Sequence, residues 1–251
     1  MHGFALSMAY KYVALVLMLG GVNFFGKKVG LEFDHPVTES DVREGSHVGP
    51  AKTNDFSGSI LTDKYFFGFG WGHLANFHRN DFKSDSDAAV RERNVRLSKM
   101  TSLIDTNGAY QIATNWLNGI GIDLAALDRK YKLNIVQWRY RAEGFSQGPV
   151  MLPVYQVEWR GSPTVAAQRR GRQMAVVTLS ILGSTKELIE YHVLDDSLFV
   201  SPPIKIVEPE KLLALPDSEF QQYNAEQRSN LVVRATATGI GASAPTTATP
   251  K

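Results

Sequence analysis

After Lys132 the spacing of the apolar residues changes from a helical period to a period of two, and this change constrains the fold most. Over residues 106–121 the apolar side chains recur at offsets of three and four, which is typical of a helix with one apolar face. Asp105 or Thr106 is placed to cap the start of that helix. A second short helix is predicted over residues 124–131, with Asp123 as its N-cap.

The segments that follow the two helices alternate between apolar and polar residues, as half-buried strands do. We expect four strands, over residues 133–141, 154–160, 174–182 and 186–193. The inward-facing side chains are expected to be Val136, Trp138, Tyr140, Tyr155, Val157 and Trp159. Trp116 on the first helix would then meet Trp138 and Trp159 in one core.

A short connection joins the last two predicted strands, and its length sets their register. A three-residue loop over 183–185 places Leu179 opposite Ile189 and Val177 opposite Tyr191 on one apolar face. A two-residue loop would place charged side chains on that face, because a slip of one residue turns a strand inside out. We therefore predict the three-residue loop.

Together these elements predict an α+β domain, with a helical layer packed on one face of a four-stranded antiparallel sheet. Pro216 divides two further predicted helices, and the residues after them are a low-complexity stretch of small and polar residues, typical of a disordered tail. The expected organisation is a signal peptide or anchor over 1–26, a loop-rich lead-in over 27–94, the core domain over 95–207, C-terminal helices over 208–228 and the tail over 229–251.

Residues 12–26 form an apolar run that lysines flank on both sides. At about 1.5 Å per residue a helix of this length spans roughly 22 Å, less than the roughly 30 Å of a membrane's hydrocarbon core. The run therefore favours an export signal peptide, and an exported protein, over a stable anchor. An uncleaved anchor and a buried helix of a cytosolic fold remain the alternatives.

An aromatic and glycine-rich segment over residues 65–78 stands out within the lead-in. We expect an irregular segment that covers one edge of the core, because glycine in such a run usually marks a bend or a close backbone approach. The alternative is an aromatic platform for a sugar, a peptide or a membrane interface, with Trp71 as the contacting ring. His73 and His78 are five residues apart and do not share a helix face, which argues against a zinc site.

The composition excludes several classes of function. The chain has no cysteine, so it has neither disulfides, thiol nucleophiles nor cysteine-ligated metals. A net charge of +2, with basic residues spread along the chain, does not give the concentrated positive charge that nucleic-acid binding needs. We found no phosphate-binding loop, nucleophile elbow or metalloprotease motif, and we expect no cofactor.

The order of one helix and four antiparallel strands resembles the PepSY-type and cystatin-like domains of exported bacterial proteins, over roughly residues 100–207. The residues that carry the resemblance are Ala109, Ala113 and Leu117 in the helix, Tyr155 and Val157 in the second strand, and the turn at Gly183 before residues 187–193. It implies a binding or inhibitory accessory module rather than a catalyst. The whole chain, notably LSKMTSLIDTNGAYQIATNWL, is similar to a group of uncharacterised exported bacterial proteins, which implies no function.

Two sets of side chains are candidates for a functional site. The first is basic, since strand alternation places Arg139, Arg141 and Arg160 on the outer sheet face and a loop adds three more arginines. Guanidinium groups bind carboxylates and phosphates through paired hydrogen bonds, so these residues and Trp71 are the predicted ligand-binding set. The loop arginines are Arg169, Arg170 and Arg172.

The second set is acidic and lies at the end of the last predicted strand. Glu190 and His192 share a face, and Asp195 follows in the loop, so the three could hold a metal ion or act as a base.

The leading hypothesis is an exported, non-enzymatic protein that binds another protein, or an anionic component of the cell envelope, through its sheet and its basic loop. The first alternative is a metal-assisted hydrolase that uses the acidic set. The second is a structural subunit of an envelope or surface assembly, which would be oligomeric.

Overall fold

The computed structural model describes residues 2–31, 33–43, 46–48, 57–82, 88–143, 148, 150–162 and 173–200. Within these ranges only the backbone is described for residues 2–13, 47, 48 and 143. The predicted C-terminal helices over 208–228 and the predicted tail over 229–251 lie outside the described residues.

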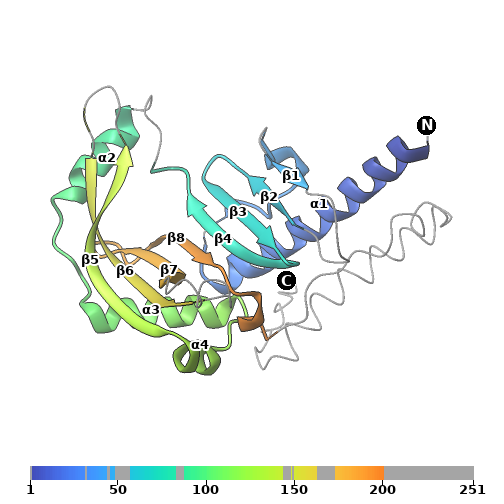
Figure 1. The fold of residues 1–251 in the computed structure, drawn as a ribbon. Helices are drawn as coiled ribbons and strands as arrows, with labels where there is room; N and C mark the ends of the chain where they lie inside the picture. Colours follow the sequence, from blue (N-terminus) through green and yellow to red (C-terminus); the bar gives the residue numbers. More distant parts are fainter. Residues whose placement is uncertain are drawn as a thin grey trace, which may run out of the picture.

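One antiparallel sheet of eight strands organises the described chain, in the order β1-β2-β3-β4-β8-β7-β6-β5 (Figure 1). It consists of two consecutive meanders, β1 to β4 and β5 to β8, which join where β4 pairs with β8. The first meander contains β1 (His47–Val48), β2 (Gly58–Leu61), β3 (Tyr65–Gly70) and β4 (His73–Arg79). The second contains β5 (Lys132–Glu143), β6 (Val150–Gly161), β7 (Met174–Leu182) and β8 (Leu188–Val193).

The second meander confirms the four strands expected from the sequence, but the sheet has eight strands rather than four. The prediction of an irregular segment over residues 65–78 is wrong, because this segment is the β3–β4 hairpin. In β3 the aromatic rings of Tyr65, Phe67 and Phe69 are buried on one face, while Phe66, Gly68 and Gly70 lie on the other. Trp71 and Gly72 form the two-residue turn of this hairpin. Their φ values are 52° and 73°, and a type I′ hairpin turn requires a positive φ at both positions.

Four α-helices accompany the sheet: α1 (His2–Lys28), α2 (Ala88–Ser98), α3 (Thr106–Gly119) and α4 (Leu124–Lys130). Short 3₁₀ helices occupy Glu39–Asp41 and Asp196–Leu198. The two predicted helices and their N-caps are confirmed. The Asp105 carboxylate accepts a hydrogen bond from the Gly108 amide at 2.8 Å, and the Asp123 carboxylate accepts one from Ala126 at 2.9 Å.

The helices cover both faces of the sheet rather than one. The main core lies between one face and the helices α1, α3 and α4. A second, smaller core lies on the opposite face, where Leu97 of α2 packs with Leu152, Val154 and Leu182. The expected α+β arrangement is therefore present, and α2 adds a layer that the sequence did not predict.

The pairing of β7 with β8 differs by two residues from the predicted register. Leu179 lies opposite Tyr191 rather than Ile189, and Val177 lies opposite Val193. A two-residue shift leaves Leu179 and Tyr191 on their predicted face, so the apolar pattern could not distinguish the two registers for them. Ile189 was predicted on that face as well, but an irregularity between Ser180 and Ile181 places it in the smaller core on the opposite face. The turn is longer than predicted and includes Lys186, whose φ of 67° is unusual for a residue other than glycine.

The expected cluster of three tryptophans is only partly correct. Trp116 and Trp159 are 9% and 0% exposed and belong to the main core, where the Trp159 indole donates a hydrogen bond to Asp128 at 2.7 Å. Trp138 is 59% exposed. It lies on the edge strand β5 and on the face opposite to Trp159, because its partner in the register is Val154.

The C-terminal half of α1 belongs to the main core. Ala14, Leu17, Met18 and Val22 are buried, and they share this core with the aromatic residues of β3 and β4. Within the part of the chain that the structure describes, no helix combines the length and the apolar character needed to cross a membrane. Export and signal-peptide cleavage remain predictions.

Candidate functional site

Two of the three predicted acidic-set residues lie together on the sheet. Glu190 and His192 of β8 pair with His78 and Asn76 of β4, and a recess of about 330 Å³ lies over them. The Glu190 carboxylate accepts a hydrogen bond from the Ser180 hydroxyl at 3.0 Å. Partial desolvation lowers the pKa of His192, although the negative charge of Glu190 opposes this shift.

Asp195 does not join them. Its carboxylate accepts hydrogen bonds from the Tyr131 hydroxyl at 2.6 Å and from the Ser197 amide at 3.1 Å, at the end of α4 and the start of the second 3₁₀ helix. Burial opposes the ionised form, but hydrogen bonds from Ser197 and Tyr131 outweigh it and lower the pKa of Asp195. Among the described residues, no three His, Asp or Glu side chains are placed to hold a metal ion.

The predicted basic set does not form one surface. Arg139 and Arg141 have odd positions in β5 and share a face, whereas Arg160 of β6 lies on the opposite face. Arg160 is also distant from Arg139 along the sheet, because the partner of Arg139 in β6 is Pro153, seven residues before Arg160. The guanidinium of Arg160 donates a hydrogen bond to Glu158 at 2.7 Å. The expectation of a common face is therefore wrong. The three loop arginines Arg169, Arg170 and Arg172 lie outside the described residues.

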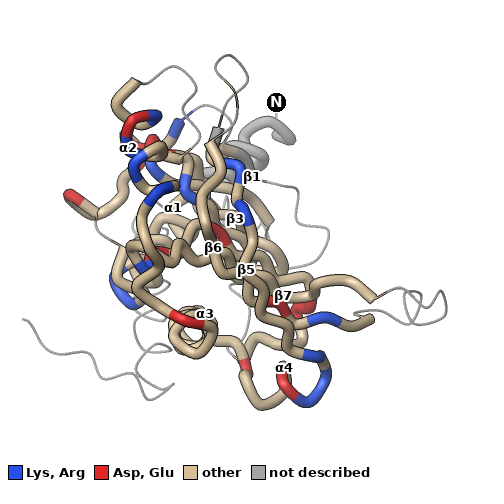
Figure 2. The backbone as a smooth tube through the Cα atoms, turned by 90° about the vertical axis from the view of Figure 1, so that its left-hand side faces the viewer, with Lys and Arg blue, Asp and Glu red and all other residues tan. Residues whose placement is uncertain are grey.

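Strand β5 is the last strand of the sheet, and none of the described residues adds a strand to its outer edge. The strand is twelve residues long, and Lys132, Arg139 and Arg141 are its exposed charged side chains. Residues 132–142 contain no carboxylate. Figure 2 looks onto this side of the molecule, where Lys and Arg also occur on α2 and at the end of α4. The edge is long, open and basic.

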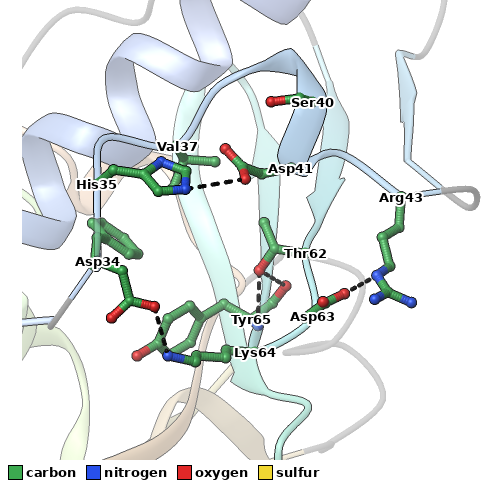
Figure 3. Close-up of a pocket in the computed structure, with 11 residues that line it drawn as sticks. Asp34, His35, Val37, Ser40, Asp41, Arg43, Thr62, Asp63, Lys64 and Tyr65 are labelled. Atoms are coloured by element: carbon green, nitrogen blue, oxygen red, sulfur yellow. Dashed lines mark hydrogen bonds and ion pairs between the residues drawn. The ribbon is translucent and has the colours of Figure 1, made fainter.

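A hollow of about 290 Å³ lies between the segment after α1 and the β2–β3 turn (Figure 3). Its charged side chains are paired with one another: Lys64 with Asp34 at 3.2 Å, His35 with Asp41 at 3.6 Å, and Arg43 with Asp63. These side chains are largely exposed, and ion pairs at exposed positions contribute little to stability. The hollow therefore has no unsatisfied charge with which to select a ligand.

A larger cleft of about 490 Å³ lies beside the end of β4, and an arginine with two carboxylates is part of its lining. Arg79 donates two hydrogen bonds to Asp81, at 3.0 and 2.8 Å, and one more to Glu187. Burial disfavours the charged guanidinium, but the hydrogen bonds and attraction from Asp81 and Glu187 outweigh it and raise the pKa of Arg79. Arg79 is 13% exposed and Glu187 43%.

Arg93 of α2 completes this network. It donates hydrogen bonds to the carboxylate and to the backbone carbonyl of Asp81. Its Nε is buried and has no hydrogen-bond partner among the described residues. Both guanidinium groups also lie over the buried ring of Phe82, that of Arg79 at 4.9 Å and that of Arg93 at 4.7 Å from its centre, a geometry that favours cation–π attraction.

Sequence reasoning did not find this cleft. Its residues come from the segment after α1, the start of β3, the end of β4, α2, α3 and the β7–β8 turn. Arg79 and Glu187 are 108 positions apart, so no local motif connects them. The comparisons with known proteins add no assignment, since no family model, no curated protein and no solved structure matches this chain.

Proposed function

We propose that this chain is a non-enzymatic accessory protein that binds an extended, acidic segment of another protein along the free edge of β5. The observation that carries the proposal is a twelve-residue edge strand that carries three basic residues over 132–142 and a single carboxylate, Glu143, at its end. An open edge presents unpaired backbone N–H and C=O groups, which an incoming strand can pair with.

The positive charge of this edge favours an acidic strand over a second copy of the chain. Two copies of the chain paired through β5 would bring Lys132, Arg139 and Arg141 of each copy into one seam, and like charges near one another on paired strands are destabilising. An acidic strand would instead bring opposite charge to this seam. Arg139 and Arg141 are two positions apart on one face, so alternate residues of an added strand would face both. Exposed Trp138 offers an apolar contact on the opposite face.

The protein acts outside the cytoplasm in this proposal. Support comes from the sequence alone, through the lysine-flanked apolar run over residues 12–26 and the likeness to PepSY-type and cystatin-like domains of exported proteins. A partner protein of the cell envelope or a secreted one would carry the acidic segment. The hydrolase alternative receives no support, because Asp195 lies apart from Glu190 and His192.

Binding of a labelled peptide tests this proposal. The probe is a fluorescein-labelled heptapeptide that alternates Glu and Val, and the comparison peptide has Lys in place of each Glu. Fluorescence anisotropy at low salt should show binding of the acidic peptide and not of the basic one. Arg139→Glu should weaken that binding by about tenfold, since charge contacts at a protein interface typically contribute on the order of 1 kcal/mol or more.

Arg43→Glu is the matched control, because Arg43 is exposed and lies beside β2, at the other end of the sheet from β5. It should bind the acidic peptide as the unchanged chain does. Equal affinity for the acidic and basic peptides, or an Arg139→Glu variant that binds normally, would refute the proposal. Binding to vesicles of anionic lipid without binding to the peptide would replace it with recognition of a membrane surface.

A further inference from the structure

The cleft beside Arg79 is distinct from the β5 edge, and its lining combines charged and apolar side chains. Its apolar walls are Val29, Leu31, Trp116 and Leu188. Its charged side chains are Lys64, Arg79, Arg93 and Lys186 against Asp34, Asp81 and Glu187. Four cations and three carboxylates leave one positive charge uncompensated within the cleft. A volume of about 490 Å³ lies within the range of small-molecule sites.

We propose that this cleft binds a small monocarboxylate with an apolar body, and that Glu187 occupies the position of the ligand's carboxylate when the ligand is absent. The carboxylate would meet the guanidinium of Arg79, and the apolar body would lie against Trp116 and the residues after α1. Guanidinium groups recognise carboxylates through paired hydrogen bonds, which accounts for the ligand class.

The two carboxylates on Arg79 differ in how easily a ligand could displace them. Asp81 is 17% exposed and holds both Arg79 and Arg93, so it is part of the permanent framework. Glu187 is 43% exposed and makes a single hydrogen bond to Arg79 from the β7–β8 turn. The Thr185 hydroxyl donates a hydrogen bond to the Glu187 carboxylate at 2.7 Å, so Glu187 has a second partner within its own turn besides Arg79.

Arg93 belongs to the same permanent framework as Asp81. Its two terminal guanidinium nitrogens bond to Asp81, while its Nε is buried and has no partner among the described residues. Because this Nε is enclosed by protein rather than open to the cleft, the ligand's carboxylate would meet Arg79 and not the Nε of Arg93.

Calorimetric titration of the full chain tests the proposal, with 4-phenylbutyrate as the probe. Its neutral amide and inorganic phosphate are the comparison compounds. The carboxylate should bind, whereas the amide should not, because it carries no negative charge for Arg79. Phosphate should bind more weakly, because it has no apolar body for Trp116. Equal or stronger binding of phosphate or the amide would overturn the assignment of a monocarboxylate.

Two variants test the role of Glu187 and of Arg79. Glu187→Gln removes the competing charge from an exposed turn and should raise the affinity for 4-phenylbutyrate about fivefold or more, which is a typical size for coupling between two groups. Arg79→Lys loses the paired hydrogen bonds and should abolish binding. If Arg79→Lys fails to fold, Glu187→Gln still tests the proposal by itself, because unchanged or weaker binding of 4-phenylbutyrate to that variant contradicts it.

Arg96→Glu is the control for the cleft, since Arg96 is exposed on α2 outside the cleft lining and its substitution should leave the titration unchanged. The two proposals fail separately. Absence of 4-phenylbutyrate binding says nothing against peptide binding at β5, and the peptide result does not bear on the cleft.

Discussion

Replacing two tryptophans of neighbouring strands by alanine tests where the core lies. Trp138 of β5 and Trp159 of β6 have the same alternating context in the sequence, but the structure places them on opposite faces of the sheet. Trp159 is fully buried in the main core, and Trp138 is 59% exposed at the sheet edge. The two substitutions remove the same atoms from two very different environments.

The expected magnitudes follow from this difference in burial. Trp159→Ala should lower the free energy of unfolding by about 3–5 kcal/mol through the cavity it leaves. Loss of the 2.7 Å indole hydrogen bond to the Asp128 carboxylate adds about 1 kcal/mol. At about 2–4 °C per kcal/mol for a chain of this size, Tm should fall by roughly 8–24 °C. Trp138→Ala should cost less than about 1 kcal/mol, as for other surface substitutions.

Urea unfolding followed by far-ultraviolet circular dichroism is the assay, because the signal does not depend on the tryptophans that are removed. Trp159→Phe is an intermediate variant that keeps an aromatic ring and loses the hydrogen bond to Asp128, so its stability should lie between the other two. Equal destabilisation by the alanine variants at 138 and 159 would show that both rings are buried. It would refute the alternation that places them on opposite faces.

Two further predictions follow. Leu17 of α1 is 2% exposed in the main core, so Leu17→Ala should lower the free energy of unfolding of the full chain by about 2–5 kcal/mol in urea; an unchanged midpoint would show that α1 does not pack against β2 to β4. The pKa of His192 is lowered from its ordinary value of 6.5, so the unfolded chain takes up this proton more readily than the folded chain does. Stability should therefore decrease as the pH falls through 6.5, and His192→Gln should show a smaller decrease between pH 7 and pH 5.5 in thermal unfolding.

The sequence predicted the second meander and its helices well, because each of those elements carries its own signal. The apolar period identified α3 and α4, and the carboxylates of Asp105 and Asp123 marked their first residues. Alternation located β5 to β8 and correctly placed Val157 and Trp159 in the core. These features depend on neighbours within a few positions, so they can be read without knowledge of the whole fold.

The first meander was missed although its signal was present. Tyr65, Phe67 and Phe69 recur with a period of two, but the glycines between and after them were interpreted as a bend rather than as part of a strand. The two-residue shift between β7 and β8 was not detectable at all, since it leaves Leu179 and Tyr191 on the face that was expected. Alternation determines the face of a strand and does not determine which residue it pairs with.

Some features of the candidate sites could be predicted from the sequence, and others depend on the tertiary structure. The sequence by itself placed Glu190 beside His192 and gave β5 its basic residues, because strand alternation and charge are local properties. Only the tertiary structure separated Asp195 from that pair, exposed Trp138 at a sheet edge, and joined Arg79 to Glu187 across 108 positions. Edges, clefts and ion-pair networks arise from how distant segments pack, and no short stretch of sequence contains that information.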